Sequence, residues 1–433
     1  MLTKPRAALA LALLLPLLNG CGIDDIDAGH VRLVNATTEF GTMDLYESTT
    51  ELSGGTASNA VGAYQDVDKG QAVFNVKNGG SSSTSATTTQ TVSKDAHYTI
   101  VAFVNANALQ TAWLTDDEPT PDPGVAKLRV FNAAPGEAAG VDVYVTTNAC
   151  GALTIADTAV ASDVTGLQGS YSDLTAAAGG VTANICVTAT GDKGDLRLAI
   201  PSLTLTNRQV ATLILTKTAG GILMNGLLLN QQGTLTGYPN SSARVRLVAD
   251  AAGAGLVAAT FNGTDLGSSA SPNVGSYTTV GAGPVTLGLT INGTAVGAAA
   301  LSTAAGGDYT LLVAGSVASP TIALLADDNI ASTSTSLPVS MRLVNGLNGV
   351  GGAATLTANG SVIGGGTAFG AASAYTNVAA SAGVAELTAK SGGATLWDVT
   401  AQTLTSGNVY TVFLLGDAAP ASSIDGELRA DND

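Results

Sequence analysis

The side chains that most readily act as nucleophiles, metal ligands or redox groups are scarce in this chain of 433 residues, which has three cysteines and two histidines. Cys150 and Cys186 form no Cys-x-x-Cys motif and have no histidine nearby, so neither a metal pair nor a redox couple is supported. His30 and His97 stand apart in the sequence, without a His/Glu/Asp pattern at zinc-ligand spacing. No Gly-x-Ser-x-Gly, glycine-rich phosphate loop or recognised pair of catalytic carboxylates occurs. We therefore expect no enzymatic activity and no catalytic residue.

Acidic residues gather where apolar runs end. One cluster is Asp116, Asp117 and Glu118, and another is Asp327 with Asp328. Carboxylates at the joints between domains could bind Ca²⁺, which takes about six to eight oxygen ligands. The alternative is a solvated acidic strand end that improves solubility and discourages edge pairing. Because the clusters lack the D-x-D-x-D-G frame of a calcium loop, Ca²⁺ is the weaker hypothesis, and we expect no other cofactor.

The sequence contains four copies of one repeated unit. Each copy opens with a similar pentapeptide whose second residue is arginine, at 31–35, 128–132, 245–249 and 341–345. The four arginines are Arg32, Arg129, Arg246 and Arg342. They could face a ligand, but a half-exposed strand residue beside a local carboxylate is the simpler interpretation. A tyrosine follows midway in each copy, and we expect it to pack at a domain corner: Tyr64, Tyr171, Tyr277 and Tyr375.

Within each copy the sequence favours strands and turns. Residues 141–145 alternate with the period of a strand, and Asn-Gly dipeptides suited to type I′ hairpin turns occur at 262–263, 292–293 and 359–360. Closely spaced strands of this kind predict an all-β chain of four tandem Ig-like or transthyretin-like β-sandwich domains. A unit of about 100 residues has the size of a domain, so we expect beads joined by linkers. The predicted repeats cover residues 31–118, 127–232, 244–328 and 340–433.

The first residues have the features of an export signal. Lys4 and Arg6 precede an apolar run over 7–18 that is too short for a stable membrane span, and the run leads into Leu-Asn-Gly-Cys21. This end resembles a bacterial lipobox, which implies cleavage before Cys21 and a lipid on its side chain. Gly22 after the cysteine resembles the pattern of outer-membrane delivery. We therefore expect a signal peptide over 1–20, a tether over 21–30 and a lipid-anchored protein that faces the periplasm or the outside.

Export also bears on the remaining cysteines. Exported compartments are oxidising, so with Cys21 lipidated we expect Cys150 and Cys186 to form a structural disulfide. The 17 basic residues are outnumbered by 33 acidic ones, and the formal net charge is −16. A chain without a basic surface cannot displace counterions from phosphates, so a nucleic-acid partner is not expected.

Residues 128–135, Leu-Arg-Val-Phe-Asn-Ala-Ala-Pro, and residues 141–145, Val-Asp-Val-Tyr-Val, carry a family resemblance. They are similar to domain-of-unknown-function family 4397, whose units open with V-R-[VL]-[VL]-[HN]-A-[SA]-P and continue to V-D-V-Y-V. The resemblance implies tandem domains in bacterial envelope proteins, often lipoproteins, and brings no catalytic residue.

From the sequence we therefore expect a non-catalytic structural, spacer or protein-binding and adhesive role. The expected partners are the membrane, through the N-terminal lipid, and an unidentified envelope or surface protein. A calcium- or polysaccharide-binding surface module is the alternative, and an enzyme of unknown type is the least favoured hypothesis.

Overall fold

The computed structural model describes residues 27–105, 108–134, 140–167, 169–175, 180–297, 300–332 and 334–432. Within these residues the chain forms 37 strands and two short 3₁₀ helices, η1 (Cys150–Ala152) and η2 (Ala421–Ser423), which confirms the all-β prediction. The predicted signal peptide, Cys21 and the first six residues of the predicted tether lie outside the described residues. No helix of the described part has the length and apolar character needed to cross a membrane.

The strands build four sandwich units with one plan. In each unit the first strand pairs in parallel with a strand near the unit's end, and the other strand pairings are antiparallel. Unit 1 consists of β1 (Ala28–Asn35), β2 (Thr42–Glu47), β3 (Thr50–Ala57), β4 (Ala60–Val61), β5 (Gln65–Asp68), β6 (Gly70–Asn78), β7 (Thr84–Val92), β8 (His97–Asn105) and β9 (Ala108–Thr115). Unit 2 consists of β10 (Val125–Asn132), β11 (Val141–Thr146), β12 (Ala159–Val164), β13 (Ser172–Thr175), β14 (Val181–Ala189), β15 (Asp192–Leu205), β16 (Val210–Lys217), β17 (Met224–Asn230) and β18 (Leu235–Tyr238).

The second half of the chain repeats this plan. Unit 3 consists of β19 (Ser242–Ala251), β20 (Leu256–Phe261), β21 (Thr264–Ala270), β22 (Asn273–Gly281), β23 (Gly283–Val285), β24 (Leu287–Ile291), β25 (Thr294–Ala295), β26 (Leu301–Thr303), β27 (Asp308–Ser316) and β28 (Ser319–Asp327). Unit 4 consists of β29 (Val339–Asn345), β30 (Ala354–Ala358), β31 (Ser361–Thr367), β32 (Ala371–Ala372), β33 (Thr376–Val378), β34 (Ser381–Ser391), β35 (Ala394–Leu404), β36 (Val409–Gly416) and β37 (Ile424–Ala430). The first strand begins at Ala28, so residues 28–30 belong to unit 1 and not to the predicted tether.

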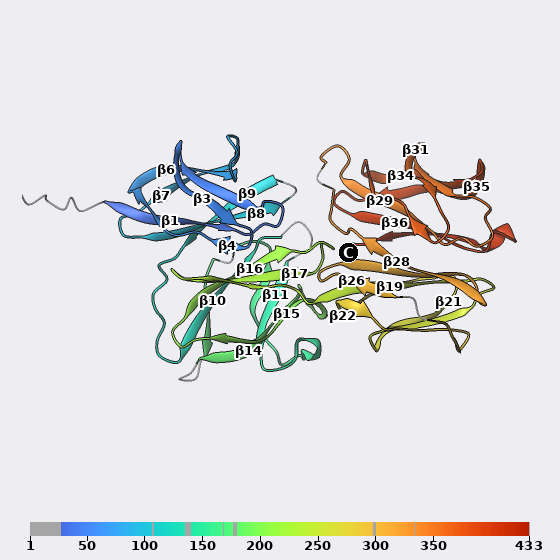
Figure 1. Ribbon diagram of the computed structural model, residues 1–433, viewed down its shortest axis with the longest axis horizontal. Coiled ribbons are helices and arrows are strands. Elements are labelled where there is room, and N and C mark those ends of the chain that lie inside the picture. The colour runs from blue at the N-terminus through green and yellow to red at the C-terminus, as the bar shows by residue number, and fades with distance from the viewer. Residues whose placement is uncertain are drawn as a thin grey trace, which may run out of the picture.

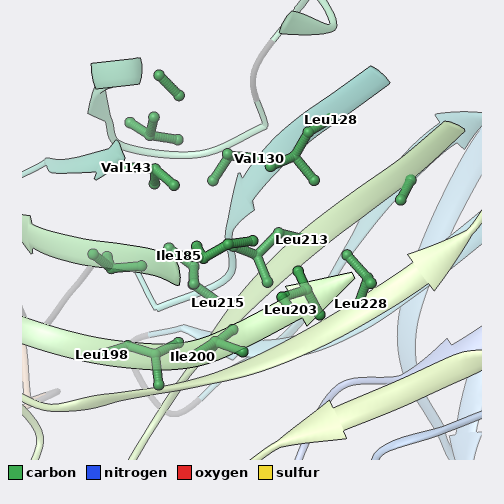
Figure 2. Packing of buried hydrophobic residues seen from close by; sticks show 14 of the residues in the cluster. Leu128, Val130, Val143, Ile185, Leu198, Ile200, Leu203, Leu213, Leu215 and Leu228 are labelled. Atoms are coloured by element: carbon green, nitrogen blue, oxygen red, sulfur yellow. The ribbon is translucent and has the colours of Figure 1, made fainter. Parts of the chain in front are cut away.

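Each unit has its own core between its two sheets. In unit 2, inward side chains of β10, β11, β14, β15 and β16 converge between the sheets (Figure 2). Leu128 and Val130 of β10 are 1% and 0% exposed because alternate residues of a strand point to one face. Burying each such side chain contributes about 1.5–3 kcal/mol. Each of the four units has its own cluster of such buried apolar side chains.

The Asn-Gly dipeptides form hairpin turns as the sequence predicts. Asn262 and Gly263 join β20 to β21 with φ angles of 51° and 85°. The other two dipeptides also have positive φ at both residues, and they connect β24 to β25 and β30 to β31. Two central residues with positive φ are what a type I′ turn requires.

The units are stacked in pairs, so the expectation of separate beads is wrong. Unit 1 lies over unit 2, and unit 4 lies over unit 3 (Figure 1). The outer faces of the sheets that hold β1 and β10 share one apolar cluster. In this cluster the ring centres of Phe103 and Phe131 are 5.2 Å apart. Val248 and Leu312 of unit 3 join Val344 and other residues of unit 4 in the same way. The first strands are buried on both faces, so each unit also packs through the outer face of its first sheet.

The two pairs also touch each other. Between β16 and β17, Gly220 donates its N–H to the carbonyl of Gly306 in unit 3 over 2.8 Å. A Cβ atom at Gly220 would lie 2.7 Å from the backbone nitrogen of Asp308, so this approach requires glycine. The segment that joins unit 1 to unit 2 is likewise attached to unit 2, since the Nε of Arg208 donates to the carbonyl of Pro121 over 2.9 Å. The structure therefore has packed connections where the sequence predicts spacers.

Candidate functional site between the paired units

The four repeated arginines occupy the same place in the four units. Each lies on the first strand, points to the outer face of its sheet and is only 1–5% exposed. Each Nε donates a hydrogen bond over 2.8–3.2 Å to a threonine in register on the neighbouring parallel strand. The pairs are Arg32 with Thr99, Arg129 with Thr212, Arg246 with Thr310, and Arg342 with Thr411. The expected half-exposed position is wrong because the facing unit covers each arginine.

The repeated tyrosines cover the arginines from the side. Each guanidinium carbon lies 4.4–4.7 Å from the centre of a tyrosine ring in its own unit, and the rings are those of Tyr64, Tyr171, Tyr277 and Tyr375. A desolvated cation over an aromatic face contributes about 2 kcal/mol. The tyrosines therefore pack against the guanidinium groups and fix their orientation, a role that no pattern in the sequence predicts.

Three buried aspartates complete the sites. Asp116, Asp327 and Asp431 stand at or just after the last long strand of units 1, 3 and 4, and each is at most 5% exposed. Asp116 accepts hydrogen bonds from Thr99 and, over 2.6 Å, from the hydroxyl of Tyr64. The same pattern recurs around Asp327, which accepts from the unit's own threonine and tyrosine.

In the second pair the carboxylates are exchanged between the units. Arg246 of unit 3 donates to Asp431 of unit 4 over 2.5 Å. In return, Arg342 of unit 4 donates to Asp327 of unit 3 and, over 2.8 Å, to the carbonyl of Ala326. These four charged side chains form one buried network across the seam between the units, here called the arginine–aspartate lock.

The first pair has a less charged version of this arrangement. Arg32 stays with its own Asp116, at 3.3 Å, and donates across the seam to the carbonyl of Gly233 over 2.6 Å. Unit 2 has Gln231 where the other units have an aspartate. The amide of Gln231 exchanges two hydrogen bonds with the backbone of Glu118, at 3.0 and 2.8 Å. Backbone and amide groups therefore replace the second carboxylate.

The electrostatics of the lock keep its charges constant. Burial acts to lower the pKa of Arg246, but the carboxylates of Asp431 and Asp327 outweigh it, so the pKa is raised. Burial, and then the neighbouring carboxylate of Asp327, raises the pKa of Tyr277 well above its usual range. The arginine therefore stays charged and the tyrosine neutral, which suits an interface better than proton transfer.

The structure does not assemble the acidic residues named as calcium ligands into one site. Asp116 and Asp327 bind arginines, as described above. Asp117 accepts the backbone N–H of His97 over 2.7 Å, Glu118 pairs with Lys127, and Asp328 accepts the N–H of Ile330. Among the described residues no group of three or more His, Cys, Asp or Glu is placed to hold a metal ion.

The predicted disulfide is present in unit 2. The sulfur atoms of Cys150 and Cys186 are 2.01 Å apart, and both cysteines are buried beside Tyr144. The bond ties η1 to β14 and therefore closes a long loop onto the sheet.

With this geometry in place, residues 29–144 match the family model named Domain of unknown function (DUF4397). This stretch is a DUF4397-like domain. The DUF4397 match runs from β1 to β11, so it contains the Arg32 site and reaches into unit 2. The predicted resemblance is confirmed for this stretch, whereas DUF4397 domains in tandem over the later units remain a prediction.

Similarity to individual proteins is slight. No curated protein sequence matches the chain. A solved structure of CBMbc, a family CBM26 module of Eubacterium rectale Amy13K in complex with maltoheptaose, is 12% identical with a TM-score of 0.15, and the match covers 49% of this chain and 96% of that one. BcpA, the major pilin subunit of Bacillus cereus, is 12% identical with a TM-score of 0.12, covering 66% and 99%. At these TM-scores the likenesses carry no argument about this chain.

Proposed function

We propose that this protein is a lipid-anchored component of the cell envelope with a non-catalytic, structural role. In this proposal Cys21 carries the lipid, the outer membrane holds the chain, and the four units stand as one rigid body in the periplasm or on the surface. A protein of the envelope or surface is the proposed partner, and nucleic acid is not.

The observation that carries the structural role is the lock between the units. Arg246, Arg342, Asp327 and Asp431 are all buried, and their charged groups are paired with one another or with backbone groups. These side chains are at most 5% exposed, so little of their polar surface is left to bind a ligand. Because these charged groups form contacts between units, they support the proposal that the protein provides a rigid body.

Metabolic labelling of the full chain with an alkyne-tagged fatty acid tests the anchor. The wild-type protein should carry the label and sediment with outer membranes, because several acyl chains on one residue anchor durably. A Cys21→Ser variant should carry no label and should leave the membrane fraction. The matched control is the double variant Cys150→Ser, Cys186→Ser, which should keep the label. Label on the Cys21→Ser variant, or a soluble wild-type protein, would contradict the anchor.

A further inference from the structure

Both histidines of the chain, His30 and His97, lie side by side on unit 1, although 67 positions separate them in the sequence. His30 on β1 is in register with His97 on the parallel strand β8, and their ring centres are 4.6 Å apart with an inclination of 32°. The side chains are 32% and 26% exposed, so dissolved ions can reach them. The fold thus assembles a pair that no sequence motif announces.

An aspartate flanks each ring. Asp66, in register with His30 on β5, places its Oδ1 2.8 Å from Nδ1 of His30. Asp117, just after β9, places its Oδ1 3.2 Å from Nδ1 of His97 and is itself fixed by the backbone N–H of His97. The four side chains form a row, Asp66–His30–His97–Asp117, across neighbouring strands.

This row sets the chemistry of the rings. A carboxylate accepts hydrogen bonds, so each neutral imidazole has its proton on Nδ1 and a lone pair on Nε2. Carboxylates that hold histidines in this way are typical of metal sites, where they orient the ring and raise its basicity. Both aspartate contacts are made by Nδ1, so Nε2 is the ring atom that remains to bind a metal.

We propose that His30 and His97 bind one divalent transition-metal ion of the zinc or copper class through their Nε2 atoms. Bonds of about 2.1 Å to one ion require the two nitrogens to lie about 3–4 Å apart. The ring centres, 4.6 Å apart, place both imidazoles within reach of one ion. Because the protein supplies fewer than three ligands, water completes the coordination shell.

The other units lack this row. At the two matching positions of β10 and β16, unit 2 has Lys127 and Val210. Unit 3 has an ion pair there, Arg244 with Asp308, whose closer contact is 2.7 Å. The proposed site therefore belongs to unit 1 alone and predicts one ion per chain.

The test uses the full chain, purified through an affinity tag without histidines. Calorimetry with Zn²⁺ should give one site, and the electron paramagnetic resonance spectrum with Cu²⁺ should show two imidazole nitrogens. The variants His30→Gln and His97→Gln should each lose at least about tenfold in affinity and one nitrogen from the spectrum. Asp66→Asn should weaken binding by about 10–100-fold but keep both nitrogens, since it removes only the group that orients His30.

Two controls keep the result clear. Glu386→Gln removes an exposed carboxylate of unit 4 and should leave the affinity unchanged. Thermal unfolding without metal should show that every variant folds. Wild-type affinity in the His97→Gln variant, or a copper spectrum without nitrogen ligands, would overturn the proposal.

Discussion

At the residue scale, each buried arginine satisfies several partners with one guanidinium group. Arg342 is 1% exposed and contacts Thr411 and Tyr375 of its own unit together with Asp327 of unit 3. Burial acts to lower the pKa of Arg342, but Asp327 above all reverses this, so its charge persists. Removing one partner of such a network leaves the other charge buried without compensation.

We therefore expect Arg342→Ala to lower the free energy of unfolding by about 3–5 kcal/mol. Urea denaturation followed by circular dichroism measures this loss. The matched control is Lys69→Ala, because Lys69 pairs with Asp27 while 57% of its side chain is exposed. That change should have little effect, since solvent screens exposed ion pairs. Equal losses in the two variants would show that the lock contributes no more than a surface pair.

Asp250 is another buried carboxyl group in the seam between units 3 and 4. It takes the place that Ala36 and Ala133 have in the first pair, and a Cβ at Gly346 would lie 2.7 Å from its Oδ2. Its Oδ1 accepts the N–H of Gly416, while its Oδ2 has no partner among the described residues. Burial, and to a smaller extent the carboxylates of Asp417 and Asp425, raises the pKa of Asp250 to about 8.

This pKa makes stability depend on pH in a definite direction. The folded state holds the proton of Asp250 more tightly than the unfolded state does. The contribution of this group to the free energy of unfolding is therefore greatest below about pH 4 and is lost as the pH rises through about 8. We expect Asp250→Ala to flatten this fall, so the variant should gain a few kcal/mol over wild type between pH 5 and pH 9. Denaturation midpoints at both pH values measure the gain, and parallel pH profiles would contradict it.

At the element scale, the disulfide and a charged side chain together shape the loop after β11. Cys150 in η1 is joined to Cys186 in β14 across 36 residues. In the same loop Asp157 accepts hydrogen bonds from the side chain of Thr146, at 2.7 Å, and from the backbone of Thr154. These bonds lower the pKa of Asp157 to about 2, so the loop keeps this anchor under mildly acidic conditions.

Replacing both cysteines by serine should therefore destabilise unit 2 by roughly 4 kcal/mol, because the open loop regains entropy in the unfolded state. Urea denaturation of the oxidised wild type and the double variant measures the difference. Reduced wild-type protein is the control and should behave like the variant. Only the oxidised wild type should show the higher free energy of unfolding. Equal stability in all three samples would contradict a structural role for the bond.

At the scale of the whole molecule, the two pairs of units meet through the loop around Gly220. A compact chain of this length has a radius of gyration of about 22 Å, and we expect small-angle scattering to give a value near it. In Gly220→Ala the added Cβ would lie 2.8 Å from the carbonyl oxygen of Gly306. The two pairs should then separate and the radius of gyration should increase.

The control for this experiment is Gly41→Ala, where no atom lies within 4 Å of the added Cβ. That variant should scatter like wild type. An unchanged radius in Gly220→Ala would show that the joint between the pairs does not depend on this close approach. A larger radius in both the wild type and the control would restore the model of separate beads.

Local patterns in the sequence were enough to predict the secondary structure and the fold of each unit. Strand alternation, as at 141–145, and the Asn-Gly turns depend on neighbouring residues, so they are visible without a structure. The disulfide was also predictable, because Cys150 and Cys186 were the pair left over once Cys21 was set aside. The regular return of an arginine and a tyrosine marked the right residues but gave no information about their partners.

The all-β architecture and the Cys150–Cys186 disulfide are therefore predictable from the sequence. The exchange of carboxylates between Arg246 and Arg342, and the contact between His30 and His97, become visible only in the folded chain. The physical reason is that these contacts join residues far apart in the chain. Their geometry depends on parallel pairing and on the burial of a second apolar face, and neither leaves a local pattern in the sequence.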